Sequence, residues 1–107
     1  MSFSVYILRC ADDSFYVGHT EDLEVRLAAH EQGVYDGYTK SRRPVTLVFS
    51  EQFATREEAL IAERRIKGWT RAKKLALIRG DWWALRFLAQ KYFEETPRVR
   101  VQRRLKP

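Results

Sequence analysis

Five side chains of this 107-residue sequence belong to types that together can hydrolyse a phosphodiester. The reaction needs an aimed and activated water, neutralised phosphate charge and a stabilised leaving oxygen. Arginine suits the phosphate because its planar fork donates two parallel hydrogen bonds and stays charged. A divalent cation often assists, and one carboxylate can hold Mg²⁺ because this ion keeps several waters. The five residues are Tyr6, Tyr16, Arg26, His30 and Glu63.

Two predicted strands carry the tyrosines. Residues 3–10 and 15–17 are rich in β-branched and aromatic residues, and the turn formers at 11–14 join them into a β-hairpin. Side chains alternate along a strand, so Tyr6 shares a face with Leu8. The lone cysteine of the chain lies in the first of these segments, where a small buried hydrophobic residue is the expected role.

A predicted helix follows the hairpin at once. It runs from about residue 21 to 32, and Thr20 is its expected N-cap. Arg26 and His30 lie one turn apart and flank the leucine stripe of this helix on a common side. The helix therefore presents a cation and an imidazole together.

The second half of the chain predicts one more strand and then helices. A loop over 34–44 leads to a strand over 45–49 or slightly beyond, and a capping box opens a helix over 55–68. Glu63 lies at the edge of the apolar stripe of that helix. Strands first and helices later is an α+β order. Two further helices are expected over 70–79 and 82–94.

The bulk properties indicate one soluble domain that binds a polyanion. The length suits a single domain, and no apolar run approaches the ~20 residues that span a bilayer. The net charge of +6 favours nucleic acid as the partner. One cysteine and the lack of a secretory signal favour a reducing, cytoplasmic setting.

Short motifs over roughly residues 3–79 resemble those of the GIY-YIG nuclease superfamily. Ser4-Val5-Tyr6 and Tyr16-Val17-Gly18 are similar to the two halves of its signature. The segment 38–45 is especially similar to small stand-alone bacterial members of the YhbQ-like type. The other matching positions are Arg26, His30, Tyr38 and Glu63.

The resemblance implies an α+β fold with a small three-stranded mixed or antiparallel sheet flanked by helices, and this chain adds a C-terminal helix. It implies a nuclease-like domain over residues 1–80, with 81–107 forming a helix and a basic tail packed on the same domain. It also implies metal-dependent endonuclease activity on DNA, with one Mg²⁺ or Mn²⁺ held by Glu63.

The same resemblance implies a role for each catalytic residue. Arg26 would neutralise phosphate charge. Tyr6 is the leading candidate for the general base, but a free tyrosine has a pKa near 10, so His30 stays an alternative. Tyr16 and His30 would assist in proton handling or in binding the scissile phosphate, and Tyr38 matches a further aromatic residue of the predicted catalytic set.

Three departures from the family pattern bear on catalysis. Ser4 replaces the first glycine of the signature, and His19 stands where some relatives have lysine. The chain contains no asparagine, so a polar asparagine of some members is missing. The strength of catalysis is therefore open.

Phosphate contacts give affinity without sequence information, and basic side chains make most of them. The residues that we expect to contact the DNA backbone are His19, Lys40, Arg42, Arg43, Arg64, Arg65 and Lys67.

Other interpretations stay open. Arg26 can pair with Asp22, and Glu63 with Lys67, since each pair is four residues apart on a helix. A catalytically weak or inactive nucleic-acid-binding protein on the same scaffold would share the basic surface. A protein-interaction module would use the tryptophans at 82 and 83.

The predicted function is DNA cleavage in repair or in the processing of structured DNA. The sequence leaves open the choice of DNA or RNA, the substrate structure and the oligomeric state. The catalytic hypothesis depends on one spatial expectation, which is that the phenols, Arg26 and Glu63 gather around a common pocket.

Overall fold

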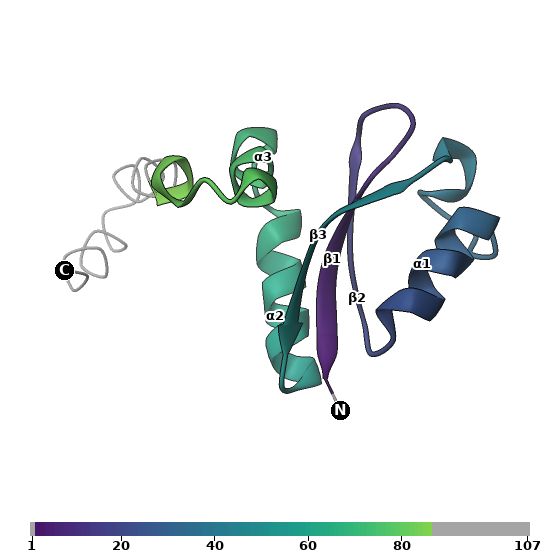
Figure 1. Ribbon diagram of the computed structural model, residues 1–107, viewed down its shortest axis with the longest axis horizontal. Coiled ribbons are helices and arrows are strands. Elements are labelled where there is room, and N and C mark those ends of the chain that lie inside the picture. Colours follow the sequence, from purple (N-terminus) through teal and green to yellow (C-terminus); the bar gives the residue numbers. More distant parts are fainter. Residues whose placement is uncertain (1, 87–107) are drawn as a thin grey trace. The chain divides into compact units, whose positions relative to one another are not determined.

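Strands and helices follow the predicted order in a computed structural model of the chain, which describes residues 2–86 (Figure 1). The elements, in chain order, are β1 (Phe3–Arg9), β2 (Phe15–Thr20), α1 (Leu23–Gln32), the 3₁₀ turn η1 (Lys40–Arg42), β3 (Thr46–Phe53), α2 (Arg56–Lys67) and α3 (Arg71–Arg79).

The three strands form one antiparallel sheet in the order β2-β1-β3. The predicted hairpin is confirmed, with Tyr6 opposite Gly18 and Leu8 opposite Tyr16. The central strand β1 is covered on both faces, so its residues 5–8 are almost completely buried. The α+β fold with a small antiparallel sheet and flanking helices is thus confirmed.

The two faces of the sheet are covered by different helices, with α1 on one side and α2 on the other (Figure 1). Tyr6, Leu8 and Cys10 belong to a core cluster into which Leu23 and Leu27 of α1 pack. Alternation places Val5 and Ile7 on the opposite face, where α2 packs against the strands. The side on which a β1 side chain points therefore decides which helix it meets.

Three element boundaries differ from the sequence-based prediction. The N-cap of α1 is Asp22, whose carboxylate accepts from the Val25 N–H at 3.2 Å, and Thr20 instead ends β2. Strand β3 continues to Phe53 because its pairing with β1 extends as far as Phe3. The predicted loop after α1 contains the turn η1.

The helix signals in the second half are confirmed. The Thr55 hydroxyl accepts from the Glu58 N–H at 3.1 Å and caps α2. The Thr70 hydroxyl accepts from the Lys73 N–H at 3.2 Å and caps α3. Asp81 caps a further helical segment that includes residues 82–86 and carries the exposed Trp82 and Trp83.

The chain forms two compact units, residues 1–68 and 69–107. The first contains the sheet, α1 and α2, and the second contains α3. The rest of the predicted C-terminal helix and the basic tail lie outside the described residues, so the division after residue 80 stays a prediction. No helix within residues 2–86 has the length and apolar character needed to cross a membrane.

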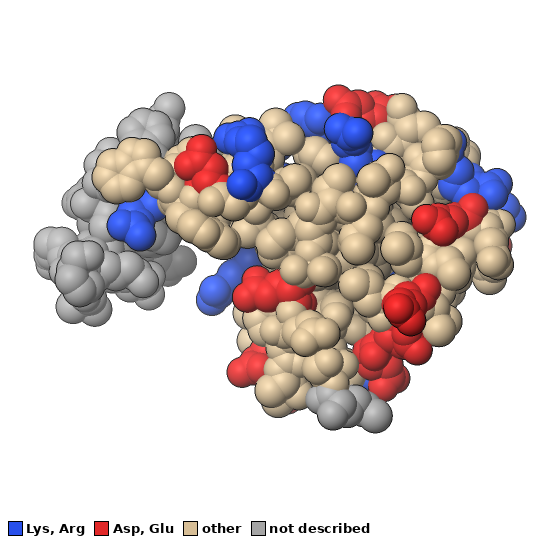
Figure 2. Space-filling model, viewed as in Figure 1, with Lys and Arg blue, Asp and Glu red and all other residues tan. Residues whose placement is uncertain are grey.

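Surface charge is mixed on the face shown in Figure 2, where lysines and arginines alternate with acidic side chains. The net charge of +6 is thus not gathered into one basic patch on this face.

Candidate active site

A buried chain of three polar side chains lies between the sheet and α1. The Tyr6 hydroxyl is 3.0 Å from His30 Nε2, and His30 Nδ1 is 2.8 Å from the Thr39 hydroxyl. All three residues are buried, and only 1% of Tyr6 is exposed. Both ring nitrogens of His30 therefore have a partner, which fixes the orientation of the imidazole.

Arg26 lies beside this chain, one helical turn before His30. Its guanidinium contacts the hydroxyl of Tyr6 and lies 5.0 Å from the ring centroid of Tyr35. Burial lowers the pKa of Arg26, but the oxygens of the two phenols outweigh burial and raise it. Asp22 caps the helix instead of pairing with this side chain. The guanidinium is thus held by neutral groups and keeps its full charge.

The protonation of Tyr6 and His30 follows from their surroundings. Burial, with a smaller contribution from Tyr16, raises the pKa of Tyr6 to about 12, although Arg26 opposes the shift. Burial and then the charge of Arg26 lower the pKa of His30. At neutral pH the phenol is therefore protonated and the imidazole neutral. This arrangement disfavours Tyr6 as the general base, the role that the sequence had suggested first.

Gly18 is required for the position of Tyr6. A Cβ added at Gly18 would lie 2.6 Å from the Tyr6 hydroxyl oxygen and 2.8 Å from its Cζ. Both distances are too short for a Cβ to fit. The phenol of Tyr6 can therefore lie over β2 only because Gly18 has no side chain. The close approach of Tyr6 therefore explains why the second half of the signature ends in a glycine at position 18.

The other two predicted catalytic tyrosines lie around the same chain of polar groups. Tyr16 is half-buried, with its ring centroid 6.3 Å from that of Tyr6 and 5.1 Å from that of His30. Tyr38 stacks on Tyr16 with an angle of 23° between the rings. The predicted residues Tyr6, Tyr16, Arg26, His30 and Tyr38 thus form one cluster, which we call the α1-face cluster.

Glu63 belongs to a second cluster, on the α2 face. It is 8% exposed, one carboxylate oxygen is bonded to His19 Nδ1, and the other is 2.6 Å from the Lys67 ammonium. Burial raises the pKa of Glu63, but Lys67 and His19 outweigh burial and lower it. Glu63 is therefore ionised at neutral pH, and the pairing with Lys67 left open by the sequence is present.

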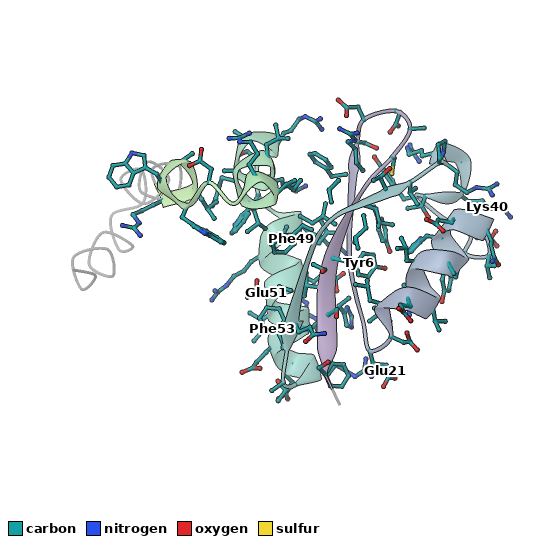
Figure 3. The ribbon with its side chains drawn as sticks, viewed as in Figure 1. Tyr6, Glu21, Lys40, Phe49, Glu51 and Phe53 are labelled. Carbon is teal, nitrogen blue, oxygen red and sulfur yellow. The ribbon has the colours of Figure 1, made fainter. Side chains whose placement is uncertain are left out.

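The helix residues of the pocket expected from the sequence, Arg26 and Glu63, come from helices on opposite faces of the sheet. Tyr6 points from β1 towards α1 (Figure 3), whereas Glu63 projects from α2 on the other face. The two clusters approach each other at the edge strand β2, where Gly18 faces Tyr6 and its neighbour His19 bonds Glu63. The charge of Glu63 still raises the pKa of Tyr6, so the clusters interact around the strand.

Glu63 is the residue that we predicted to hold a divalent cation. No group of three metal-binding side chains occurs among residues 2–86. One ionised, nearly buried carboxylate nevertheless suits Mg²⁺, which keeps several of its waters. The ammonium of Lys67 is half exposed and can leave the carboxylate oxygen when a cation arrives.

Several predicted backbone-binding residues make contacts within the protein. Arg42 pairs with Asp12 at 3.1 Å and donates to the Tyr38 carbonyl at 2.9 Å. Lys40 pairs with Asp36 at 3.0 Å. Arg43 Nε donates to the carbonyl of Lys40 at 3.0 Å. These side chains stabilise the loop between α1 and β3, whereas Arg64 and Arg65 lie exposed on α2.

Two residues of the α1-face cluster were missed in the sequence analysis. Thr39 is buried and orients His30, and its only signal was its place directly after Tyr38. Tyr35 is half exposed beside Arg26 and His30, with ring centroids of Tyr35 and His30 5.4 Å apart. Neither residue type is distinctive, so contact in the fold identifies them.

Comparison with known families decides the relationship. The model of the GIY-YIG catalytic domain matches residues 2–76. The chain belongs to the GIY-YIG family. The match covers the hairpin, α1 and α2, and so includes both clusters.

Relatives include small bacterial proteins that carry the name UPF0213 protein. One from Bacillus pumilus is 52% identical over 69 residues, which cover 64% of this chain and 70% of the relative. One from Staphylococcus aureus is 47% identical over 78 residues, covering 73% of this chain and 95% of the relative. This GIY-YIG chain is therefore similar to the small bacterial members of the family, as the motif at 38–45 predicted.

Two solution NMR structures share the fold. A UPF0213 protein from Bacillus halodurans has 39% identity and a TM-score of 0.50, over 74% of this chain and 84% of that one. A protein from E. faecalis has 36% identity and a TM-score of 0.54, over 78% and 88%. Membership of the GIY-YIG family indicates a nuclease that acts on nucleic acid, and such nucleases generally use a divalent metal.

Proposed function

We propose that this GIY-YIG protein is an endonuclease that hydrolyses DNA phosphodiester bonds with the help of one Mg²⁺ or Mn²⁺. The observation that supports this proposal is the position of Arg26. This half-buried cation is held by the phenols of Tyr6 and Tyr35. Within residues 2–86 it pairs with no carboxylate. Such a guanidinium is ready to take a phosphate, since its charge is already oriented and not neutralised.

In this proposal the α1-face cluster binds and activates the phosphodiester. Arg26 neutralises the phosphate. Tyr16 is the half-buried phenol next to the polar chain, so it aims the attacking water. His30 is neutral and serves as the proton acceptor, reached through the hydroxyl of Tyr6. Tyr6 itself orients Arg26 and His30, because its pKa of about 12 opposes phenolate formation.

The α2-face cluster holds the cation. Glu63 supplies the carboxylate, and a hard divalent ion bound there would stabilise negative charge on the phosphate and the leaving oxygen. His19 bonds the other carboxylate oxygen and fixes its direction. Hydrogen-bond partners of this kind around a metal ligand commonly set its affinity.

A nicking assay on supercoiled plasmid and forked DNA tests the proposal, with Mn²⁺, with Mg²⁺ and with EDTA. We expect metal-dependent cleavage that is lost in Arg26→Ala and in Glu63→Ala. The exposed residue Glu58 on α2 gives the matched control, because Glu58→Ala should cut like the wild type. Robust cutting by both site variants would contradict the mechanism.

The alternative function is nucleic-acid binding without cleavage on the same scaffold. The observation in its favour is that both oxygens of Glu63 already have side-chain partners, His19 and Lys67. It predicts DNA binding that is sensitive to salt, with no metal-dependent nicking. For the endonuclease, we also propose a role in the cytoplasm, in DNA repair or in the processing of structured DNA.

A further inference from the structure

Tyr35 lies beside the α1-face cluster, where it contacts Arg26, and the proposed mechanism gives it no contact with the substrate. Its ring is 5.0 Å from the guanidinium carbon of Arg26 and its centroid 5.4 Å from that of His30. Tyr35 thus contacts Arg26, to which we assign the phosphate, and His30, to which we assign the role of proton acceptor. A nucleotide with its phosphate on Arg26 therefore has its nucleoside next to this ring.

The ring of Tyr35 is accessible, unlike the phenol of Tyr6. Tyr35 is 40% exposed, and Val34 beside it and Tyr38 in the same loop are exposed as well. An exposed aromatic surface bordered by cations suits a nucleotide, since the rings meet the base and the cations meet the phosphates. Arg26 lies over the ring of Tyr35, and Arg42 lies over the ring of Tyr38.

The loop that carries Tyr35 is tied down at both ends. The Val34 N–H donates to the carbonyl of Ala29 at 3.0 Å, and Thr39 bonds His30. Lys40 pairs with Asp36 across the loop at 3.0 Å. A ring on a preorganised loop loses less conformational entropy when it binds, so its contact contributes more to affinity.

We propose that Tyr35 is a substrate-contacting residue whose ring stacks on an unpaired nucleobase next to the phosphate held by Arg26. This assignment rests on the proposed function. It makes the preferred substrate a DNA with unpaired nucleotides at the cleavage position, such as a single strand or the arm of a fork.

The preference for an unpaired base follows from the geometry of duplex DNA. In a duplex both faces of each base are covered by its neighbours, and only the edges are open in the grooves. A flat tyrosine ring needs a base face, so it takes a base that is unpaired or has been moved out of the stack. A residue that only positioned Arg26 would affect single strands and duplexes alike.

Equilibrium binding in EDTA tests the assignment, because no cleavage can occur. The probes are a single strand that contains 2-aminopurine and a duplex of the same sequence. We expect Tyr35→Ala to weaken single-strand binding by about 5- to 150-fold and to reduce the fluorescence quenching of 2-aminopurine. Duplex affinity should change by no more than about two-fold.

Three further variants separate stacking from structure. Tyr35→Phe keeps the ring and should bind like the wild type, whereas Tyr35→Leu keeps apolar bulk and should lose single-strand affinity as Tyr35→Ala does. Ile61→Ala, at an exposed position on α2, is the matched control and should change neither affinity.

Equal losses on both DNAs, or no loss on the single strand, would overturn the role of Tyr35 alone. A wild-type protein that binds neither DNA would overturn the proposed function as well.

Discussion

The two clusters differ in the sign of the charged group at their centre and in how that charge is balanced. On the α1 face, neutral phenols surround Arg26, and no carboxylate neutralises it among the described residues. On the α2 face, Glu63 is ionised, nearly buried and held between His19 and Lys67. The first cluster is suited to an anion and the second to a cation.

This difference shows what the sheet contributes to the site. Opposite charges within about 4 Å attract strongly in a partly buried site, so Arg26 and Glu63 on one face would pair with each other. The sheet keeps α1, which carries Arg26, and α2, which carries Glu63, on separate faces. The structure thus provides both charges without letting them cancel.

The largest expected effect tests the anion side of the comparison. Arg26→Gln should lower the initial nicking rate at saturating Mn²⁺ by about 10²- to 10³-fold, because it removes the charge that faces the phosphate. Mn²⁺ affinity should stay unchanged, as measured by EPR titration. A loss of metal affinity would show that the clusters do not act separately.

A substitution at Glu63 should weaken metal binding and should not weaken DNA binding. Glu63→Gln should weaken Mn²⁺ binding by at least ~10-fold, because the carboxylate is lost. DNA affinity in EDTA should stay the same or rise, since a negative charge near the backbone is removed. Glu58→Gln, on the first turn of the same helix, is the matched control for both measurements. Weaker DNA binding by Glu63→Gln would be evidence against this division of roles.

Gly18 joins the two clusters, and a methyl group there tests the geometry. Gly18→Ala should lower the free energy of unfolding by about 1–3 kcal/mol, since the buried Tyr6 must move. Gly68→Ala is the control, because its φ is −84° and the nearest atom to an added Cβ is 3.6 Å away. Urea denaturation of both variants measures the difference, and equal stabilities would refute the steric account.

The smallest effect concerns the titration of His30. Its pKa is lowered in the folded protein, so the folded state binds fewer protons than the unfolded state. The contribution of His30 to the free energy of unfolding is therefore fully present above the pKa of the unfolded state, about 6.5. It is lost as the pH falls through the pKa of the folded state. His30→Gln should flatten the dependence of the thermal midpoint on pH as the pH falls below about 6.5. A slope as steep as that of the wild type would assign the effect to other groups.

Most of the fold could be predicted because its signals are local. Alternation marked β1, turn formers marked the hairpin, and hydroxyl caps marked α2 and α3. The error at the start of α1 is also local. Thr20 and Asp22 are both good caps, and pairing of β2 with β1 as far as Thr20 leaves the cap to Asp22.

The site was harder to predict because contact across the fold decides it. The sequence identified the residue types, and spacing placed Arg26 beside His30 on α1. It gave no sign that Glu63 projects on the other face, since the face of a helix residue depends on how that helix packs on the sheet. The same is true of Thr39 and Tyr35, whose importance comes only from what they touch.

By itself the sequence determined the elements, the family and the set of reactive groups, since these depend on residue types at short spacing. Only the tertiary structure decided which groups share a face, which are buried and which charges are neutralised. The physical reason is that pKa values, hydrogen-bond partners and the separation of Arg26 from Glu63 depend on packing between segments far apart in the chain.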